Sequence, residues 1–231
     1  MSQKKFSRSK VALFMECPRC FYLEVTKGVK RPSGFPFNLN SAVDALLKRE
    51  FDAHRTAGTK HPLQIQFGLD LKPANHPLID QWRHNFTGVQ YNDPVRAVMW
   101  YGAIDDLWID PQGTYYVVDY KATAKSTPVT ELAEWMDGYK RQMEFYQWLL
   151  RKNGLPVSNT GYFVYCTGDN TRQDFSNTIH FHSHIIPYEG SDSWVDNQLD
   201  ALMILTKSST PPEATEDCTY CSYYKKYKEN A

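Results

Sequence analysis

The residues best placed for chemistry are Asp105, Asp119 and Lys121, which occur in a segment with the pattern of a β-hairpin. Residues 98–109 and 115–121 are rich in aromatic and β-branched residues, and the Asp-Pro-Gln-Gly sequence between them is typical of a turn. If the last three turn residues form the loop, with the glycine left-handed, Asp105 lies directly opposite Asp119. Because side chains alternate along a strand, Lys121 shares a face with Asp119. The spacing therefore predicts that the three charges converge on one patch of an apolar sheet.

Such a trio of charges is costly to bury unless the charges are paired or a cation lies among them. One interpretation is a divalent metal site beside a lysine, since carboxylate oxygens suit Mg²⁺ or Mn²⁺. The other is an internal salt bridge between Lys121 and Asp119, with Asp105 facing solvent. The spacing alone leaves both interpretations open.

Three motifs occur in order along the chain: Gly102-Ala103-Ile104-Asp105, Asp119-Tyr120-Lys121, and Gln142-Met143-Glu144-Phe145-Tyr146. Together they resemble the G-x-x-D strand, D-Y-K strand and Q-x-x-x-Y helix of the PD-(D/E)XK nuclease superfamily, in its RecB-like branch. The resemblance implies an α/β fold with a restriction-endonuclease-like core, in which a mixed β-sheet is flanked by helices. It also implies metal-dependent hydrolysis of phosphodiester bonds.

The resemblance assigns roles within the hairpin. Asp105, Asp119 and the backbone carbonyl of Tyr120 would hold Mg²⁺ or Mn²⁺, which lowers the pKa of a bound water and polarises a phosphate. Lys121 would position that water or stabilise the developing negative charge.

Gln142 and Tyr146 fall on a long helix that the apolar pattern predicts from Thr130 to Arg151. Four residues apart, they share one face of that helix. The resemblance implies that Gln142 and Tyr146 orient Lys121 or the backbone of the substrate. The alternative is that Tyr146 is a core aromatic residue and Gln142 an amide with an internal partner.

Asp44 is a further candidate metal ligand. A helix is predicted to begin at Asn38 or Asn40, either of which can cap it. Relatives carry G-x-x-V-H here, and Asp44 stands where they have the histidine. A carboxylate is also an acceptable ligand for a hard metal ion, although Asp44 would equally suit a solvent-facing helix position. The residues near the apolar face are Val43, Leu46, Leu47, Glu50 and Phe51.

Two Cys-x-x-Cys pairs occur near the ends of the chain, Cys17 with Cys20 and Cys218 with Cys221. Four thiolates suit zinc or an iron–sulfur cluster, which would join the two ends as a clasp. The sequence around Cys17 is similar to the start of RecB-like nucleases of the iron–sulfur type, which favours a 4Fe-4S cluster. Those relatives supply one cysteine from the start and three from the end, so Cys20 departs from their pattern. Zinc, or no metal, stays an alternative.

Basic residues concentrate at both ends of the chain. If the clasp brings the ends together, they form one surface that can follow a DNA backbone; if it does not, they are a solubilising coat. The net charge of zero argues against purely electrostatic binding of nucleic acid. The candidate DNA-binding residues are Arg8, Lys10, Lys30, Arg31, Lys225 and Lys226.

With 231 residues, the chain is expected to form a single nuclease domain over residues 1–231. Within it, residues 1–31 and 206–231 are expected to form the cysteine-clasped subdomain, and residues 56–97 a family-specific insertion. No apolar run is long enough to span a membrane and the start is polar, so we expect a cytoplasmic protein without a membrane partner.

The expected function is that of a DNA exonuclease acting on ends or single strands. In size the chain is most similar to RecB-like exonucleases associated with CRISPR adaptation, and partners from that process or from recombination are possible. DNA repair or a mobile element's own nuclease are alternative settings. Two other classes stay open: a non-catalytic nucleic-acid-binding or assembly module with the same fold, and a zinc-bound structural protein.

Overall fold

The computed structural model describes residues 3–34 and 38–230 and divides the chain into two compact units. Unit one consists of Met1–Phe35, Asn92–Trp100 and Ser193–Ala231. Unit two consists of Pro36–Tyr91 and Tyr101–Asp192. The predicted hairpin lies in unit two except for residues 98–100, and all four clasp cysteines lie in unit one.

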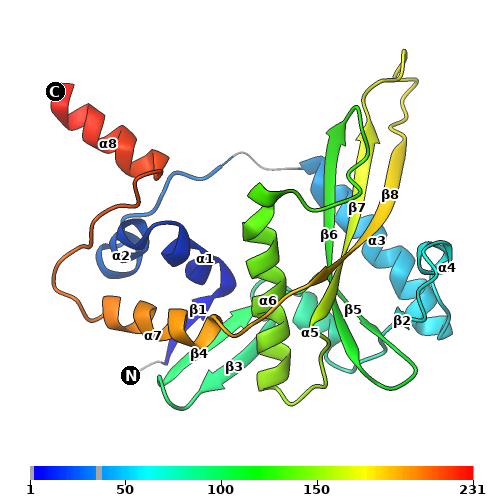
Figure 1. Cartoon of the computed structure of the whole chain (residues 1–231), viewed down its shortest axis with the longest axis horizontal. Helices are drawn as coiled ribbons and strands as arrows, with labels where there is room; N and C mark the ends of the chain where they lie inside the picture. The colour runs from blue at the N-terminus through cyan, green and yellow to red at the C-terminus, as the bar shows by residue number, and fades with distance from the viewer. Residues whose placement is uncertain (1–2, 35–37, 231) are drawn as a thin grey trace. The chain divides into compact units, whose positions relative to one another are not determined.

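Unit two is built on a five-stranded mixed sheet in the order β2-β5-β6-β7-β8 (Figure 1). The two central strands β6 and β7 are parallel, and the other neighbouring pairs are antiparallel. This confirms the mixed sheet expected from the sequence. The strands are β2 (Lys72–Pro73), β5 (Asp106–Ile109), β6 (Tyr115–Lys125), β7 (Thr160–Asp169) and β8 (Phe181–Glu189).

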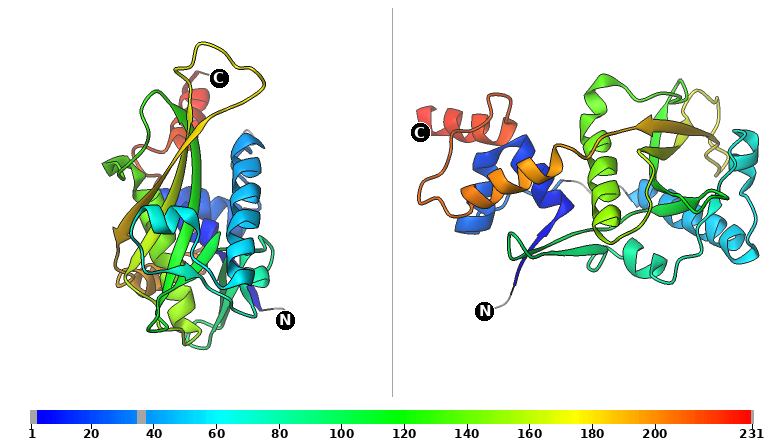
Figure 2. Two further views of the ribbon diagram at one scale, coloured as in Figure 1. Left: turned by 90° about the vertical axis from the view of Figure 1, so that its right-hand side faces the viewer. Right: turned by 60° about the horizontal axis from the view of Figure 1, so that its bottom comes forward.

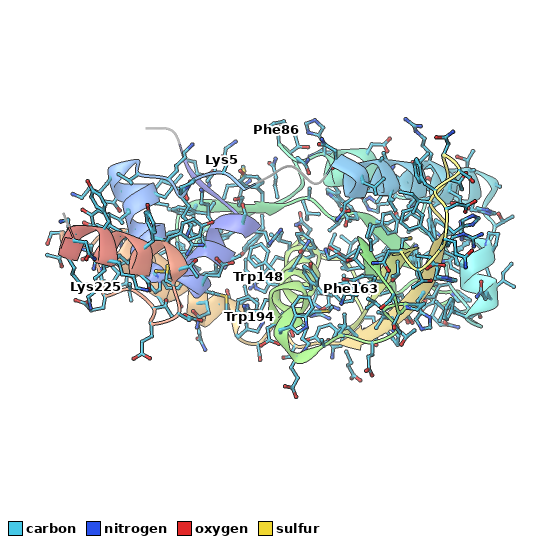
Figure 3. The ribbon with its side chains drawn as sticks, turned by 90° about the horizontal axis from the view of Figure 1, so that it is seen from above. Lys5, Phe86, Trp148, Phe163, Trp194 and Lys225 are labelled. Atoms are coloured by element: carbon cyan, nitrogen blue, oxygen red, sulfur yellow. The ribbon has the colours of Figure 1, made fainter. Side chains whose placement is uncertain are left out.

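Helices cover both faces of this sheet, as expected. Parallel neighbours need a long crossover, which is provided here by the 3₁₀ turn η1 (Glu134–Met136) and α6 (Asp137–Lys152). Helix α3 (Asn38–Ala57) runs along the other face (Figure 2). Trp148 of α6 and Phe163 of β7 are buried on the α6 side (Figure 3). The core on the α3 side contains Leu47, Phe51, Trp108, Val118, Tyr120 and Val164.

The register of the hairpin is as predicted from the turn. Ile109 pairs with Tyr115 and Leu107 with Val117, and the turn glycine, Gly113, has φ +89°. The prediction of one continuous strand over residues 98–109 was wrong. The chain leaves β4 (Val98–Gly102) and enters β5 only at Asp106.

The break between these strands has a structural cause. Strand β4 belongs to a separate three-stranded sheet, in the order β1-β4-β3, with β1 at Lys4–Ser7 and β3 at Val89–Asp93. Between the two sheets, the N–H of Ile104 donates to the carbonyl of Trp82 in α5 (Ile79–Arg83) at 3.1 Å.

The helix that was predicted from Thr130 begins only at Asp137. The preceding loop is tied to the sheet, because the N–H of Val129 donates to the hydroxyl of Thr167 on β7 at 3.1 Å. Trp135, which lies within the predicted helix, is 69% exposed in η1. On α3 the buried positions include Leu47 and Phe51, whereas Leu46 is 60% exposed.

Most of the segment read as an insertion, residues 56–97, belongs to unit two, and only its last six residues, 92–97, belong to unit one. The segment contains α4 (Pro62–Gln66), which was not predicted, as well as β2, α5 and β3. Strand β2 pairs with β5 and so extends the sheet at its edge.

Unit one contains α1 (Arg8–Glu16), α2 (Pro18–Lys27), α7 (Val195–Leu205) and α8 (Thr219–Asn230). Its core includes Phe6, stacked on Trp100 with ring centroids 5.5 Å apart. Unit one is larger than the subdomain predicted from residues 1–31 and 206–231, because it also takes in residues 92–100 and α7. None of the helices described could cross a bilayer, since none combines sufficient length with sufficient apolar character.

Two glycines provide a matched test of the packing in unit two. Gly88 and Gly58 both have positive φ, at +59° and +68°, so alanine at either position is strained by about 1–2 kcal/mol. At Gly88 the added Cβ would also lie 2.5 Å from the carbonyl oxygen of Gly102, whereas at Gly58 it would meet nothing within 4 Å. We therefore expect Gly88→Ala to lower the free energy of unfolding by at least about 1 kcal/mol more than Gly58→Ala, measured by urea denaturation. Equal losses would show that the close approach at Gly88 is absent.

Candidate functional site

Asp119 is the central residue of the candidate site and is completely buried, with 0% exposure. Its Oδ1 accepts a hydrogen bond from Nε2 of Gln142 at 2.7 Å, and its Oδ2 forms an ion pair with Lys121. Gln142 comes from α6, which covers this face of β6. A buried carboxylate is tolerated only with such partners, so the sheet and α6 together hold it in place.

Asp105 lies immediately before β5 and beside Asp119. Its Oδ2 accepts a hydrogen bond from the backbone N–H of Tyr120 at 2.9 Å, and its Oδ1 lies 3.6 Å from Nζ of Lys48. Asp105 therefore does not simply face solvent, as the salt-bridge alternative required. The predicted neighbours Asp105, Asp119 and Lys121 do come together.

Asp44 joins the same site through Lys48, a residue that the sequence reasoning missed. Nζ of Lys48 lies 2.9 Å from Oδ2 of Asp44, so its ammonium group pairs with both Asp44 and Asp105. The spacing of Asp44 and Lys48, four residues apart on a helix, was the signal that could have found this pair. Asp44 is thus oriented toward the hairpin and is only partly exposed.

The charges of the site affect one another's pKa values. Burial, followed by the negative charge of Asp105, raises the pKa of Asp44 despite its pairing with Lys48. Burial alone would lower the pKa of Lys121, but the charges of Asp119 and Asp105 outweigh it and raise that pKa. Lys121 is therefore an ammonium ion at neutral pH. The Tyr139 ring, whose centroid is 4.5 Å from Nζ, covers it.

Tyr146 and Tyr120 support the site from its two sides. Nε2 of Gln142 lies 3.4 Å from the hydroxyl of Tyr146, which is itself buried behind the amide. The side chain of Tyr120 points to the opposite face of β6, where its hydroxyl donates to Asp106 at 2.7 Å. Asp106 also pairs with Arg55 of α3, and both of these side chains are buried. Sequence reasoning did not identify this pair.

The arrangement offers hard oxygen donors from α3, from the chain before β5 and from β6, which is the chemistry that Mg²⁺ and Mn²⁺ prefer. Asp44, Asp105 and Asp119 do not, however, meet at a single point, because the ammonium groups of Lys48 and Lys121 lie among them. Across residues 3–34 and 38–230, one group of potential metal ligands has all its ligand atoms within 4.8 Å of one another. That group is Cys17, Cys20, Cys218 and Cys221.

The four cysteine sulfurs come from two pairs of elements in unit one. Cys17 lies between α1 and α2 and Cys20 within α2, while Cys218 precedes α8 and Cys221 lies within it. The Sγ atom of Cys20 lies 3.6 Å from the Sγ atoms of both Cys218 and Cys221. The Sγ atom of Cys17 lies 3.9 Å from that of Cys221. Four thiolates arranged tetrahedrally around a zinc ion, with Zn–S bonds of about 2.3 Å, have their sulfurs about 3.8 Å apart. The cluster therefore has the dimensions of a single tetrahedral ion site.

The pKa values of the cysteine thiols are shifted in different directions, so the thiols differ in how readily they become thiolates. Burial works to raise the pKa of Cys17, but hydrogen bonds from the backbone N–H groups of Cys20 and Thr215, with those of neighbouring thiols, lower it to about 6. Burial raises the pKa of Cys20 and of Cys221. One thiolate is therefore present at neutral pH, and a bound cation would stabilise the others as thiolates.

The candidate DNA-binding residues are only partly gathered. A groove of about 1160 Å³ in unit one is lined by Lys30, Arg31 and Lys225, with Arg19 and Lys228 beside them. Arg31 also pairs with Glu16 at 2.7 Å and donates to Sγ of Cys218 at 3.7 Å, so it takes part in the cysteine cluster. Arg8, Lys10 and Lys226 do not line this groove, and Lys10 pairs with Glu24.

Comparison with known families supports the motif assignment at the level of the superfamily. The family model described as the PD-(D/E)XK nuclease superfamily matches residues 38–225. The match includes Asp44, Asp105, Asp119, Lys121 and Gln142. A search of the curated proteins finds no match.

The buried pair of Arg55 and Asp106 provides a test of how the hairpin is supported. Replacing Arg55 by alanine leaves a buried carboxylate without its cation, which typically costs about 3–5 kcal/mol. We expect Arg55→Ala to lower the free energy of unfolding by that amount in urea denaturation. Arg49→Ala, on the exposed side of the same helix, is the control and should change it by less than about 0.5 kcal/mol. A similar result for both variants would contradict a supporting role for the pair.

Proposed function

Because the chain belongs to the PD-(D/E)XK nuclease superfamily, we propose that it is a metal-dependent nuclease that hydrolyses phosphodiester bonds in DNA. The observation that carries this proposal is the buried carboxylate of Asp119, held by Gln142 and Lys121, with Asp105 beside it. A purely structural buried carboxylate would also need partners such as Gln142 and Lys121, but it would not need the second pair of acids at Asp44 and Asp105 beside it.

In this proposal, the side chains of Asp44, Asp105 and Asp119, with the backbone carbonyl of Tyr120, hold one or more Mg²⁺ or Mn²⁺ ions. When bound, such an ion polarises the scissile phosphate and makes a bound water a stronger nucleophile. Gln142 keeps the Asp119 carboxylate in one orientation through its hydrogen bond to Oδ1. Lys48 reduces the repulsion between Asp44 and Asp105 by pairing with both.

Lys121 contributes a fixed positive charge. Its raised pKa keeps it protonated at neutral pH, so it is suited to stabilise negative charge rather than to act as a general base. Its ion pair with Asp119 and its contact with the Tyr139 ring limit the positions that its ammonium can take. A held charge of this kind acts on the phosphate without having to reorganise during the reaction.

The finer assignments rest on the sequence motifs. The G-x-x-D, D-Y-K and Q-x-x-x-Y series supports the RecB-like branch, and with it an exonuclease acting on DNA ends or single strands. The similarity in size to CRISPR-associated members supports a role in CRISPR adaptation, with recombination and DNA repair as alternatives.

A second candidate is a nucleic-acid-binding or assembly module that does not cleave. It is favoured by Asp44, which stands where the RecB-like branch has a histidine, and by Lys48, whose ammonium lies between Asp44 and Asp105. Both features change the charge at one side of the site while leaving Asp119, Lys121 and Gln142 in place.

For the cysteine cluster we propose one zinc ion in place of the 4Fe-4S cluster that the resemblance implies. In a four-iron cluster each thiolate binds its own iron, so the four sulfurs must lie further apart than those that share one ion. Three of the Sγ–Sγ distances are 3.6–3.9 Å and all four sulfurs lie within 4.8 Å of one another, which supports the shared ion. The two Cys-x-x-Cys pairs are also a common arrangement for structural zinc.

Loss of cleavage in two variants tests the proposed active site. We expect Asp119→Ala and Lys121→Ala to lower the rate of degradation of labelled DNA in Mn²⁺ or Mg²⁺ by at least about 100-fold. Circular dichroism should show a retained fold. Lys60→Ala, which removes an ion pair with Asp70 elsewhere in unit two, is the control and should cleave like the wild type. Full activity in Lys121→Ala would contradict the assignment, and an inactive wild type would favour the binding module.

Metal analysis tests the cluster independently of cleavage. Protein purified without chelators and without oxygen should contain one zinc ion per chain and show no visible absorption. Cys218→Ser should lose the zinc, because it removes one of four ligands, whereas Cys166→Ser, at a buried cysteine of β7, should retain it. A coloured protein with several iron atoms per chain would contradict the zinc proposal and leave the nuclease proposal intact.

A further inference from the structure

Two lysine–aromatic pairs follow one another along β6, one at the candidate active site and one further along the strand. Nζ of Lys121 lies 4.5 Å from the centroid of the Tyr139 ring, and Nζ of Lys125 lies 5.9 Å from that of Trp135. Lys121 and Lys125 are four residues apart on one strand, so their side chains leave the same face of it as Asp119. They are separated by about 13 Å along β6. After β6 the chain runs back in the opposite direction through η1 and α6. This places Tyr139 beside Lys121, the inner pair, and Trp135 beside Lys125, the outer pair.

The outer pair is open to solvent, whereas the inner pair belongs to the site. Trp135 is 69% exposed, although Trp82, Trp100, Trp108 and Trp148 are all buried. Lys125 is exposed and, within the part of the chain that the structure describes, forms no ion pair with a carboxylate. A ring that leaves 69% of its surface exposed gains less from burial than the four buried tryptophans do, so packing alone does not explain a tryptophan at this position.

We propose that Lys125 and Trp135 form a binding subsite for an extended single-stranded nucleic acid whose scissile phosphate lies near Lys121. The ring of Trp135 offers a stacking surface for one unpaired base, and Lys125 offers a cation for the adjoining phosphate. This inference rests on the proposed nuclease function and adds the state of its substrate.

Three physical arguments favour single strands over duplex. Bases in a duplex are stacked on one another, so their faces are not available to a tryptophan ring. Stacking is tolerant of base identity, which suits a nuclease that degrades any sequence. Finally, the net charge of the chain is zero, so long-range attraction to phosphates is weak and a local contact such as stacking is needed for affinity.

Binding measurements on Trp135 variants test the subsite. Fluorescence anisotropy would be recorded in EDTA, to prevent cleavage, with a labelled thymidine oligonucleotide of about 20 nucleotides, longer than typical single-strand sites. The matching uridine oligonucleotide and a blunt duplex would be used in parallel. Trp135→Ala is expected to weaken single-strand binding at least about fivefold, which corresponds to the loss of one stacked base. Trp135→Tyr should largely restore it.

Two further variants separate stacking from charge. Lys125→Ala should reduce the slope of log K against log salt by about 0.7, as expected for the loss of one phosphate contact on a single strand. Phe86→Ala is the matched control, since Phe86 is 87% exposed in the same unit but outside this segment (Figure 3), and should bind like the wild type. Thermal unfolding would establish that each variant is folded.

The outcomes distinguish this inference from the nuclease proposal. Unchanged single-strand binding by Trp135→Ala, an equal loss on single strand and duplex, or no single-strand binding by the wild type would each overturn the subsite. If the wild type does not cleave but Trp135→Ala selectively loses single strands, the subsite stands and the nuclease proposal fails. Comparison of thymidine with uridine oligonucleotides then assigns the substrate to DNA or RNA.

Discussion

The candidate site in unit two depends on the neutralisation of the buried carboxylate of Asp119. A charge completely removed from water must be compensated by partners at fixed positions, and its two oxygens receive them from different elements. Lys121 comes from the same strand, while Gln142 comes from α6 after a crossover of about twenty residues. Because the crossover between parallel strands returns over one face of the sheet, the arrangement that forms the sheet also places the amide on the carboxylate.

On the other face of the same hairpin, a second buried carboxylate is also neutralised by partners from a helix and from the sheet. Asp106 is paired with Arg55 and Tyr120, both on the α3 side, while Asp105 is turned toward Lys48. On α3, Asp44, Lys48 and Arg55 are separated by four and seven residues, so all three project from one side of the helix. Docking of that side through Leu47 and Phe51 therefore places Arg55 on Asp106 and the pair of Asp44 and Lys48 on Asp105 in one step. Support of the fold and construction of the site are coupled.

The sequence was informative where local chemistry decides the structure. The turn that ends in Gly113 sets the hairpin register, and beyond the last pair of that register, Asp106 with Val118, Asp105 accepts a hydrogen bond from the backbone of Tyr120. Contacts between distant segments could not be anticipated in this way. Lys48 and Arg55 acquire their roles only when the docked side of α3 is known, and the apolar pattern did not distinguish exposed Leu46 from buried Leu47. The loop that precedes α6 is tied to the sheet by the bond between Val129 and Thr167, which are 38 residues apart.

The two candidate metal sites are built from residues of different units of the chain. The carboxylates and Lys121 belong to unit two, which has its own core between α3 and the sheet, whereas the four cysteines belong to unit one. Within unit one, no residue of α8 is buried, so hydrophobic packing contributes little to its position. The helix is instead held through Cys221 and the adjacent Cys218, and joining them to Cys17 and Cys20 closes a loop of about 200 residues, at an entropic cost that grows only slowly with length. An ion bound by the cluster would therefore stabilise the fold of unit one, and its identity would not decide the chemistry available at Asp119 in unit two.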